Sequence, residues 1–259
     1  MLRHLSELWR RRDLVAALAA RDLQLRYKGS ALGLAWSLMH PLIVAAVYFI
    51  AFRFFLRLQI PNYPLFLLTA LLPWLFFASA LGSATSAVTA HGQLVKKVAF
   101  PRGALPASAV AAQFVHFAVG YLVVVPALAA WQVGLAPTLL AVPVLMICLA
   151  LFTCGLAFLT ATAQVYLRDT RHLVEVALQI WFWATPIVYS LEVADLERYR
   201  GWFRVNPLFP FISAFRSALV ERSWPSGLDV VSIAVITPVV FAGGFAVLAR
   251  WQQRFAEYV

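Results

Sequence analysis

Long apolar runs recur along this chain of 259 residues, and their length constrains the fold more than any other feature. Several of them approach the roughly 20 residues that an α-helix needs to cross about 30 Å of hydrocarbon. Hydrophobic residues make up 63% of the sequence and charged residues only 12%, about half the roughly 25% share of a soluble domain. The fold is therefore expected to be all-α, as a polytopic membrane protein.

Six transmembrane helices account for these runs, because a helix satisfies its own backbone groups in lipid. The predicted spans are about 31–52, 64–88, 104–131, 138–164, 173–190 and 228–249. Residues 1–30 then form a cytoplasmic amphipathic segment, and residues 31–259 form one transmembrane domain.

The basic residues indicate the orientation of these spans. The formal net charge is +10, and 14 of the 21 Lys and Arg residues fall in the termini and in alternate connections. Such an excess marks the cytoplasmic side, so both termini are predicted to be cytoplasmic. Placement between apolar runs favours contact with anionic membrane lipids and argues against binding of nucleic acid.

Two segments outside the predicted spans carry patterns of their own. Residues 1–30 place Leu and Ala near helical spacing among arginines, as in a helix lying in the membrane interface. A soluble helix packed on a partner is the alternative. The connection 191–227 contains an apolar stretch, 207–215, that is too short to span, so a periplasmic re-entrant hairpin is expected before the last span. An ordinary loop on the helix ends is the alternative.

The connection 91–102 alternates apolar and basic residues and then stops at a proline, Pro101. This pattern is typical of a short helix that docks in a partner's groove. A solvated loop whose lysines only fix the topology would explain the pattern as well.

Catalytic chemistry has few candidates at membrane depth. His40 and His116 fall in different predicted spans, and the two cysteines, Cys148 and Cys154, lie too far apart along one predicted helix for a disulfide. No metal-binding motif occurs, and the predicted helix centres hold no acidic residue of the kind an ion-coupled transporter uses. The sequence predicts no catalytic site, metal or cofactor in this chain.

A nucleotide site is also missing from the sequence. A Walker A loop requires a Gly-Lys pair to bind phosphate, and no such dipeptide occurs. If ATP drives this protein, a separate subunit must bind it.

Four sequence blocks in a fixed order carry a family resemblance. They are residues 21–36 with Pro41, residues 94–102, residues 166–173, and residues 181–189 followed by Asn206-Pro207. Together they resemble the ABC-2 type permeases that export polysaccharides such as O antigen and teichoic acid. The resemblance covers nearly the whole chain.

The resemblance implies an assembly and a location. The permease would form a homodimer with two copies of a nucleotide-binding ATPase subunit, which holds ATP and Mg, in a bacterial inner membrane. The connection 91–102 would be the coupling helix that contacts this subunit. The transported molecule would be a polyprenyl-linked polysaccharide.

Three sets of residues are expected to carry this function. The coupling set is Gln93, Leu94, Val95, Lys96, Lys97, Val98, Phe100 and Arg102. Aromatic faces suit a sliding sugar, and the candidate glycan-channel set is Trp36, Tyr48, Trp74, Trp181, Trp183 and Tyr189; for each of these, placement facing lipid is the alternative. The candidate set for the lipid diphosphate is Arg10, Arg11, Arg12, Arg26 and Lys28, with general headgroup binding as the alternative.

The expected function is therefore that of a transmembrane subunit, itself not an enzyme, which translocates a lipid-linked polysaccharide through a homodimeric channel. An ABC-2 permease for a small lipid or drug would share the fold and the partner. A membrane enzyme acting on polyprenyl-linked sugars and a passive assembly scaffold are alternatives from other classes.

Overall fold

The computed structural model of the chain describes residues 2–29, 35–55, 57, 60, 62–98, 100–131, 136–192 and 196–259. Every regular element within these ranges is helical. The longer helices are α1 (Leu2–Arg10), α2 (Arg12–Tyr27), α3 (Ala35–Phe49), α4 (Tyr63–Ala90), α6 (Ala104–Trp131), α7 (Ala141–Tyr166), α8 (Thr170–Ala184), α10 (Phe209–Arg216) and α11 (Gly227–Trp251). Short helices are α5 (Gly92–Lys97), α9 (Arg200–Phe203) and α12 (Phe255–Tyr258), with 3₁₀ turns at Pro137–Leu140, Glu197–Tyr199 and Gln252–Arg254 and π turns at Ile50–Phe55 and Ser217–Glu221.

Four of the described helical segments are long and apolar enough to cross a membrane. They are Tyr63–Ala90, Ala104–Pro126, Pro137–Tyr166 and Gly227–Tyr258. They confirm the predicted helices at about 64–88, 104–131, 138–164 and 228–249. The all-helical class is confirmed with them for the described ranges.

The other two predicted spans correspond to shorter helices. The apolar helix Met39–Phe55 covers most of the first, whose predicted beginning at residues 31–34 lies outside the described residues. The fifth corresponds to α8, whose 15 residues measure only about 22 Å. α8 stops because Thr185 precedes Pro186 and has extended backbone angles, φ −110° and ψ 130°.

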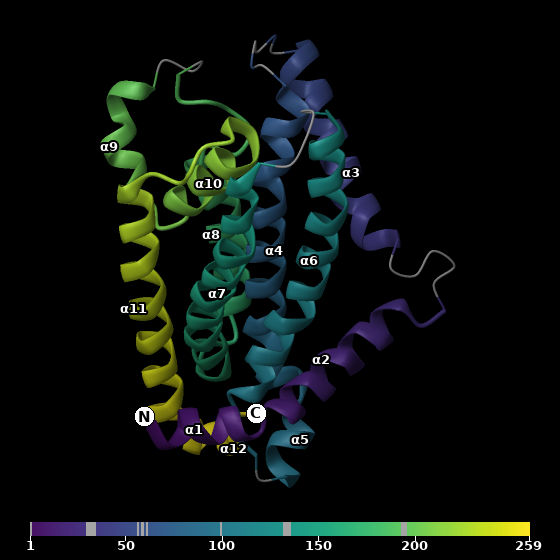
Figure 1. Ribbon diagram of the computed structural model, residues 1–259. Helices are drawn as coiled ribbons and strands as arrows, with labels where there is room; N and C mark the ends of the chain where they lie inside the picture. The colour runs from purple at the N-terminus through teal and green to yellow at the C-terminus, as the bar shows by residue number, and fades with distance from the viewer. Residues whose placement is uncertain are drawn as a thin grey trace.

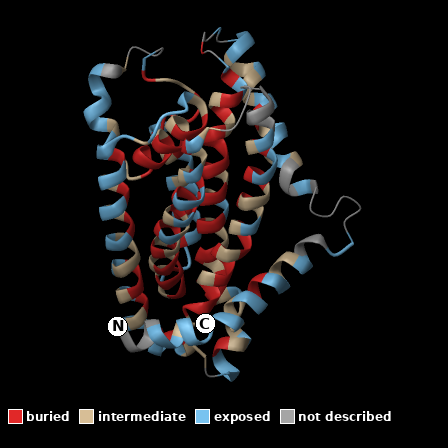
Figure 2. Cartoon of the chain, in the orientation of Figure 1, coloured by how far each residue is buried: buried red, intermediate tan, exposed pale blue. Residues whose placement is uncertain are grey.

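The core of the bundle lies where α4, α6, α7 and α10 meet. α4 packs against α6 and α7, and α7 packs against α11. Figure 2 shows the buried residues concentrated along α4, α7 and α10, whereas the outer side of α11 is exposed. Phe77, Phe152 and Phe211 are among the side chains that are almost completely buried there.

Small residues allow α7 and α11 to approach each other very closely. A Cβ atom on Gly155 would lie 2.6 Å from the backbone of Phe241, and one on Gly244 would collide with the carbonyl oxygen of Gly155. Such contacts between backbones are typical of helix pairs in membranes, where association depends on close packing.

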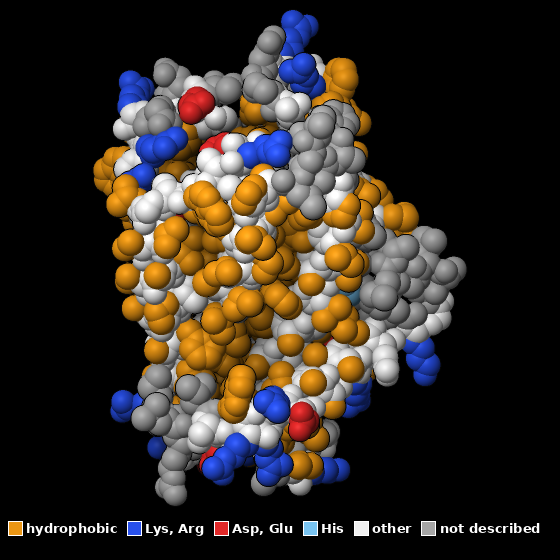
Figure 3. Space-filling view, in the orientation of Figure 1, with side chains coloured by type: hydrophobic (Ala, Val, Ile, Leu, Met, Phe, Trp, Pro, Cys, Tyr) orange, Lys and Arg blue, Asp and Glu red, His pale blue; other side chains and the backbone are white. Residues whose placement is uncertain are grey.

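Charged side chains occupy the two ends of the bundle. Figure 3 shows apolar side chains over the middle of one face and Lys and Arg side chains gathered at both ends. In Figure 1 both termini, α1, α5 and α12 lie at one end, which we call the terminal end, while α9 and α10 lie toward the other. α1 runs across the terminal end, and α2 leaves the bundle at an angle after packing against α6.

Candidate functional site

Helix α5 forms a small basic projection at the terminal end of the bundle (Figure 1). Val95 anchors its inner side and is almost fully buried, and Leu94 packs partly against the same core. The side chains of Gln93, Lys96 and Lys97 are exposed. α5 thus has a fixed apolar side and a free basic side, as a docking helix requires.

The rest of the predicted coupling set lies after α5 in the turn that leads to α6. Val98 is 49% exposed, whereas Phe100 packs partly against the core. Arg102 points inward: its Nη1 donates to the carbonyl oxygen of Gln252 across 3.1 Å, and its Nη2 lies 3.5 Å from the carbonyl oxygen of Val95. The structure therefore separates exposed members of the set from inward ones. The exposed ones are Gln93, Lys96, Lys97 and Val98, and the inward ones are Leu94, Val95, Phe100 and Arg102.

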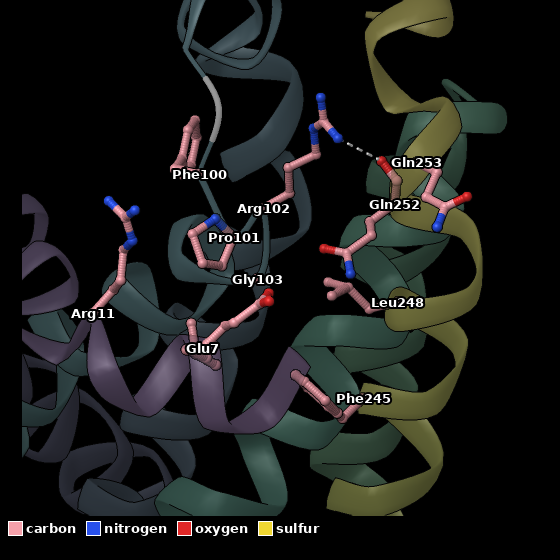
Figure 4. A pocket seen from close by; sticks show the side chains of 11 residues that line it. Glu7, Arg11, Phe100, Pro101, Arg102, Gly103, Phe245, Leu248, Gln252 and Gln253 are labelled. Carbon is pink, nitrogen blue, oxygen red and sulfur yellow. Dashed lines mark hydrogen bonds between the residues drawn. The ribbon is translucent and has the colours of Figure 1, made fainter. Parts of the chain in front are cut away.

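A cavity of about 390 Å³ lies behind this turn, between α1 and the end of α11 (Figure 4). Its walls come from the α1–α2 junction, the turn before α6 and the last turns of α11. The lining residues are Glu7, Leu8, Arg11, Phe100, Pro101, Arg102, Gly103, Phe245, Leu248, Gln252 and Gln253.

The residues proposed to bind the lipid diphosphate do not form one cluster. Arg10, Arg11 and Arg12 are exposed at the α1–α2 junction, and the guanidinium of Arg12 lies 5.8 Å from the ring centroid of Trp9. Lys28 is exposed beyond the other end of α2, a helix of 16 residues and about 24 Å. The side chain of Arg26 lies outside the described residues. One diphosphate group is too small to contact both ends of α2.

Three of the aromatic candidates line one groove between α3, α4 and α8. Tyr48, Trp74 and Trp183 surround Phe182, with ring centroids 5.5, 5.4 and 5.3 Å from it, respectively. The groove has a volume of about 380 Å³, and Gln179 adds an amide to a lining that is otherwise aromatic and aliphatic. Trp183 is 56% exposed, so it lies at the surface of the bundle.

The other three aromatic candidates lie elsewhere. The indole Nε1 of Trp181 donates to Oδ1 of Asn206 across 2.7 Å, and its ring packs on Phe77. Tyr189 donates its hydroxyl to the carbonyl oxygen of Trp183 across 2.9 Å. Trp36 is 46% exposed near the start of α3 and does not line the groove.

The structure adds residues that the sequence patterns did not single out. Phe182 is the centre of the aromatic groove, and its position between two tryptophans was the signal available in the sequence. Arg216 lies 3.7 Å from the ring centroid of Phe66 and donates to the carbonyl oxygen of Ile187 across 2.9 Å. The sequence signal for Arg216 was its position at the end of an apolar stretch, where a charged residue needs a partner.

No group of three or more His, Cys, Asp or Glu side chains that could hold a metal ion exists among the described residues. His116 lines a separate cavity of about 240 Å³ between α2, α4 and α6, whereas His40 is exposed on α3. The described residues thus form a bundle of long apolar helices with a short basic helix at one end and an aromatic groove on its side, the architecture of a multi-pass membrane protein.

Comparison with known proteins defines the family. The model of the ABC-2 type transporter membrane domain matches residues 13–220, and the chain belongs to this family. It is 30% identical over its full length to an O-antigen export system permease protein of Myxococcus xanthus, which it also covers completely. It is 32% identical to an O-antigen export system permease protein of Klebsiella pneumoniae, over 95% of this chain and 94% of that protein. A polysialic acid transport protein of Escherichia coli is 20% identical over 90% of this chain and 91% of its own length.

Proposed function

We propose that this chain is the transmembrane subunit of an ATP-driven exporter that moves a lipid-linked polysaccharide, such as O antigen, across a bacterial inner membrane. The observation that carries this proposal is the similarity along the whole chain to O-antigen export permeases. The more distant polysialic acid transport protein supports a polysaccharide as the general class of substrate.

The proposed topology has six spans with both termini in the cytoplasm. α3 with its π-helical continuation to Phe55 is the first span, and α8 with the chain that follows it is the fifth. The segment with α9 and α10 forms a re-entrant hairpin on the periplasmic side. The excess of basic residues in the termini and alternate connections supports this orientation.

The exposed side of α5 contacts the ATPase subunit in this proposal. Gln93, Lys96 and Lys97 face outward, while the buried Val95 transmits force to the bundle. ATP and Mg belong to that separate subunit, since this sequence lacks a phosphate-binding Gly-Lys pair. Closure of two ATPase subunits would push the α5 helices of two permease copies.

The aromatic groove is the proposed wall of a channel between two copies of this chain. Glycan hydroxyl groups cannot cross hydrocarbon unpaired, so a path sealed from lipid is required. Phe182 and Trp183 present ring faces that pack on sugar C–H groups without fixing them by hydrogen bonds. The outer side of α8 exposes Leu173, Val176 and Ile180, an apolar surface suited to a second copy or to lipid.

The lipid anchor stays in the bilayer during transport, and its diphosphate is held at the cytoplasmic face. The α1–α2 junction with Arg10, Arg11 and Arg12 is one candidate site, and Arg26 with Lys28 is a second, separate one. Ordinary headgroup binding at the same arginines is the alternative.

A small lipid or drug remains the alternative substrate within the same family. A membrane enzyme acting on polyprenyl-linked sugars would need catalytic groups, and the described residues form no catalytic constellation around the aromatic groove.

The test is co-purification of the permease with candidate ATPase subunits and an ATPase assay with added polyprenyl-linked glycan. We expect a stable complex whose ATPase is stimulated by the glycan and not by common drugs. Lys96→Glu/Lys97→Glu should weaken it, whereas Arg198→Glu/Arg204→Glu, a matched reversal at the other end, should leave it intact. Turnover of the glycan by the isolated chain without any ATPase would overturn the proposal.

A further inference from the structure

Both ends of helix α5 are held by the chain segment that follows α11. At its beginning, Cγ1 of Val259 lies 2.5 Å from the position that a Cβ on Gly92 would take, so the last residue packs tightly on the start of α5. At its end, Arg102 joins the carbonyl oxygens of Val95 and Gln252. A displacement of α5 must therefore move this segment.

Arg102 is well suited to join these two helix ends. The carbonyl groups in the last turn of a helix lack partners within the helix and carry partial negative charge, and a guanidinium is a favourable partner for them. Val95 lies in the last turn of α5, where this applies; Gln252 follows the last residue of α11, and its carbonyl oxygen also accepts from the backbone N–H of Phe255. The planar fork of an arginine reaches two acceptors at once, which a lysine ammonium does less rigidly.

The surroundings of Arg102 keep it turned inward. A Cβ on Gly103 would lie 3.3 Å from Leu248 of α11, so this turn lies directly against the last span. The Nε atom of Arg102 is buried and has no hydrogen-bond partner within the described part of the chain. The guanidinium of Arg102 thus points into the protein. Figure 4 shows the same orientation, with the side chain beside Gln252.

A second link continues from the end of α11 to the groove. The hydroxyl of Tyr166, the last residue of α7, donates to the carbonyl oxygen of Trp251 across 3.0 Å, and the two rings pack edge to face. Four residues later Thr170 begins α8, the helix that carries Phe182 and Trp183. The end of α11 is therefore tied to α5 on one side and, on the other, to the last residue of α7, from which a short connection leads to α8.

We propose that Arg102 is a positioning residue that transmits the displacement of α5 through the end of α11 and Tyr166 to α8, without contacting the ATPase subunit itself. This role rests on the proposed function, because it requires a partner that pushes α5. It separates Arg102 from the exposed residues of α5, which make the contact.

The test uses the complete complex of permease and ATPase subunits in lipid. Arg102→Gln should keep the ATPase subunit bound while export and glycan-stimulated ATPase fall by roughly 2- to 30-fold. Tyr166→Phe keeps the ring but removes the hydroxyl and should act in the same direction. The double variant should be no worse than the stronger single one, because both residues belong to one link. Lys97→Gln is the matched comparison and should weaken association instead.

Labels at Val98 and Gln253 give a readout that does not depend on the folding of an Arg102 variant and leaves Gln93, Lys96 and Lys97 unaltered. Both labelled side chains are exposed, one directly after α5 and one just after the end of α11. Their distance should stay constant when ATP binds to the otherwise unaltered complex. A distance that changes with ATP would overturn the inference, and so would loss of the ATPase subunit from Arg102→Gln or full export by it. Failure of the unaltered chain to bind any ATPase subunit would instead refute the proposed function.

Discussion

Trp181 and Asn206 hold the end of α8 against the segment that leads to α10. The indole Nε1–H of Trp181 donates to Oδ1 of Asn206 across 2.7 Å, and Nδ2 of Asn206 donates to Oγ1 of Thr185 across 2.8 Å and to the carbonyl oxygen of Ala184 across 3.2 Å. This bonding fixes the rotation of α8 about its axis. With Trp181 turned toward Asn206, the next residues, Phe182 and Trp183, are left to line the groove.

Replacement of Asn206 should therefore destabilise the protein and disturb the groove. Asn206→Ala leaves the partly buried Trp181 indole and the backbone N–H of Leu208 without this acceptor. Each unmet group of this kind costs about 1–3 kcal/mol, so we expect a clear fall in the thermal unfolding midpoint in detergent. Gln24→Ala, which removes an exposed amide from α2, is the control and should have little effect.

Trp181→Phe removes only the indole donor and keeps a ring beside Phe77. Its cost should be about 1 kcal/mol, less than that of Asn206→Ala. An equal stability of the Asn206→Ala variant and the unaltered protein would show that this network does not hold α8.

Removal of the Trp183 side chain from the groove should reduce transport without unfolding the protein. Trp183 is 56% exposed, so Trp183→Ala removes few interior contacts. If its ring packs on sugar, the lost burial of apolar surface amounts to on the order of 1 kcal/mol, and export should fall roughly fivefold. Trp183→Phe should retain most of the activity.

Trp224→Ala serves as the matched control for Trp183→Ala, because Trp224 is 61% exposed and lies outside the groove. Radiolabelled glycan transport into inverted vesicles gives the rate. Equal export by Trp183→Ala and Trp224→Ala would show that the aromatic groove does not line the path of the glycan.

The contact between α7 and α11 gives a prediction with an internal control. Gly244→Ala places a methyl group against the carbonyl oxygen of Gly155 and forces the helices apart, at about 1–3 kcal/mol. The neighbouring Gly243 has open space at its Cβ position, so Gly243→Ala should be neutral or slightly stabilising. Thermal unfolding of the two variants in the same detergent decides the matter; a similar loss in both would contradict the close contact.

The spanning helices were predictable because length and apolar composition alone define them. α4 begins at Tyr63 and ends at Ala90, within two residues of the predicted bounds 64–88. The predicted span 173–190 extends beyond the observed end of α8 at Ala184. The helix ends there for a local reason, because Pro186 disfavours helical backbone angles at Thr185. A hydropathy profile does not detect this helix end, because the residues beyond the proline are still apolar.

Side-chain direction was the part that sequence patterns did not supply. Trp181 and Trp183 were grouped as channel residues, yet residues two apart lie on nearly opposite sides of a helix, and Asn206 selects which one faces inward. The sequence pattern likewise grouped Arg102 with the exposed lysines of α5, because it does not show in which direction each side chain points. Its partner Gln252 is 150 positions away, so no local pattern reports the contact.

Arg216 provides the last prediction, because its guanidinium is held by an aromatic ring and a backbone carbonyl. It lies 3.7 Å from the ring centroid of Phe66 and donates to the carbonyl oxygen of Ile187, in the chain that follows α8. Tyr63 donates its hydroxyl to the next carbonyl oxygen, that of Val188, across 2.8 Å. These side chains satisfy backbone groups that a helix would otherwise satisfy, which is necessary for a non-helical segment near lipid.

Arg216→Lys should therefore be strongly destabilising even though it keeps the charge. An ammonium lacks the planar face that stacks on Phe66 and does not reproduce the directed bond to Ile187, so we expect a loss of about 1–3 kcal/mol. Arg204→Lys, at an exposed site of the same end, should change stability by less than about 0.5 kcal/mol. Thermal unfolding of both variants measures the difference. If the two substitutions cost the same, the ring and the carbonyl contribute nothing specific, and Arg216 acts only as a surface charge.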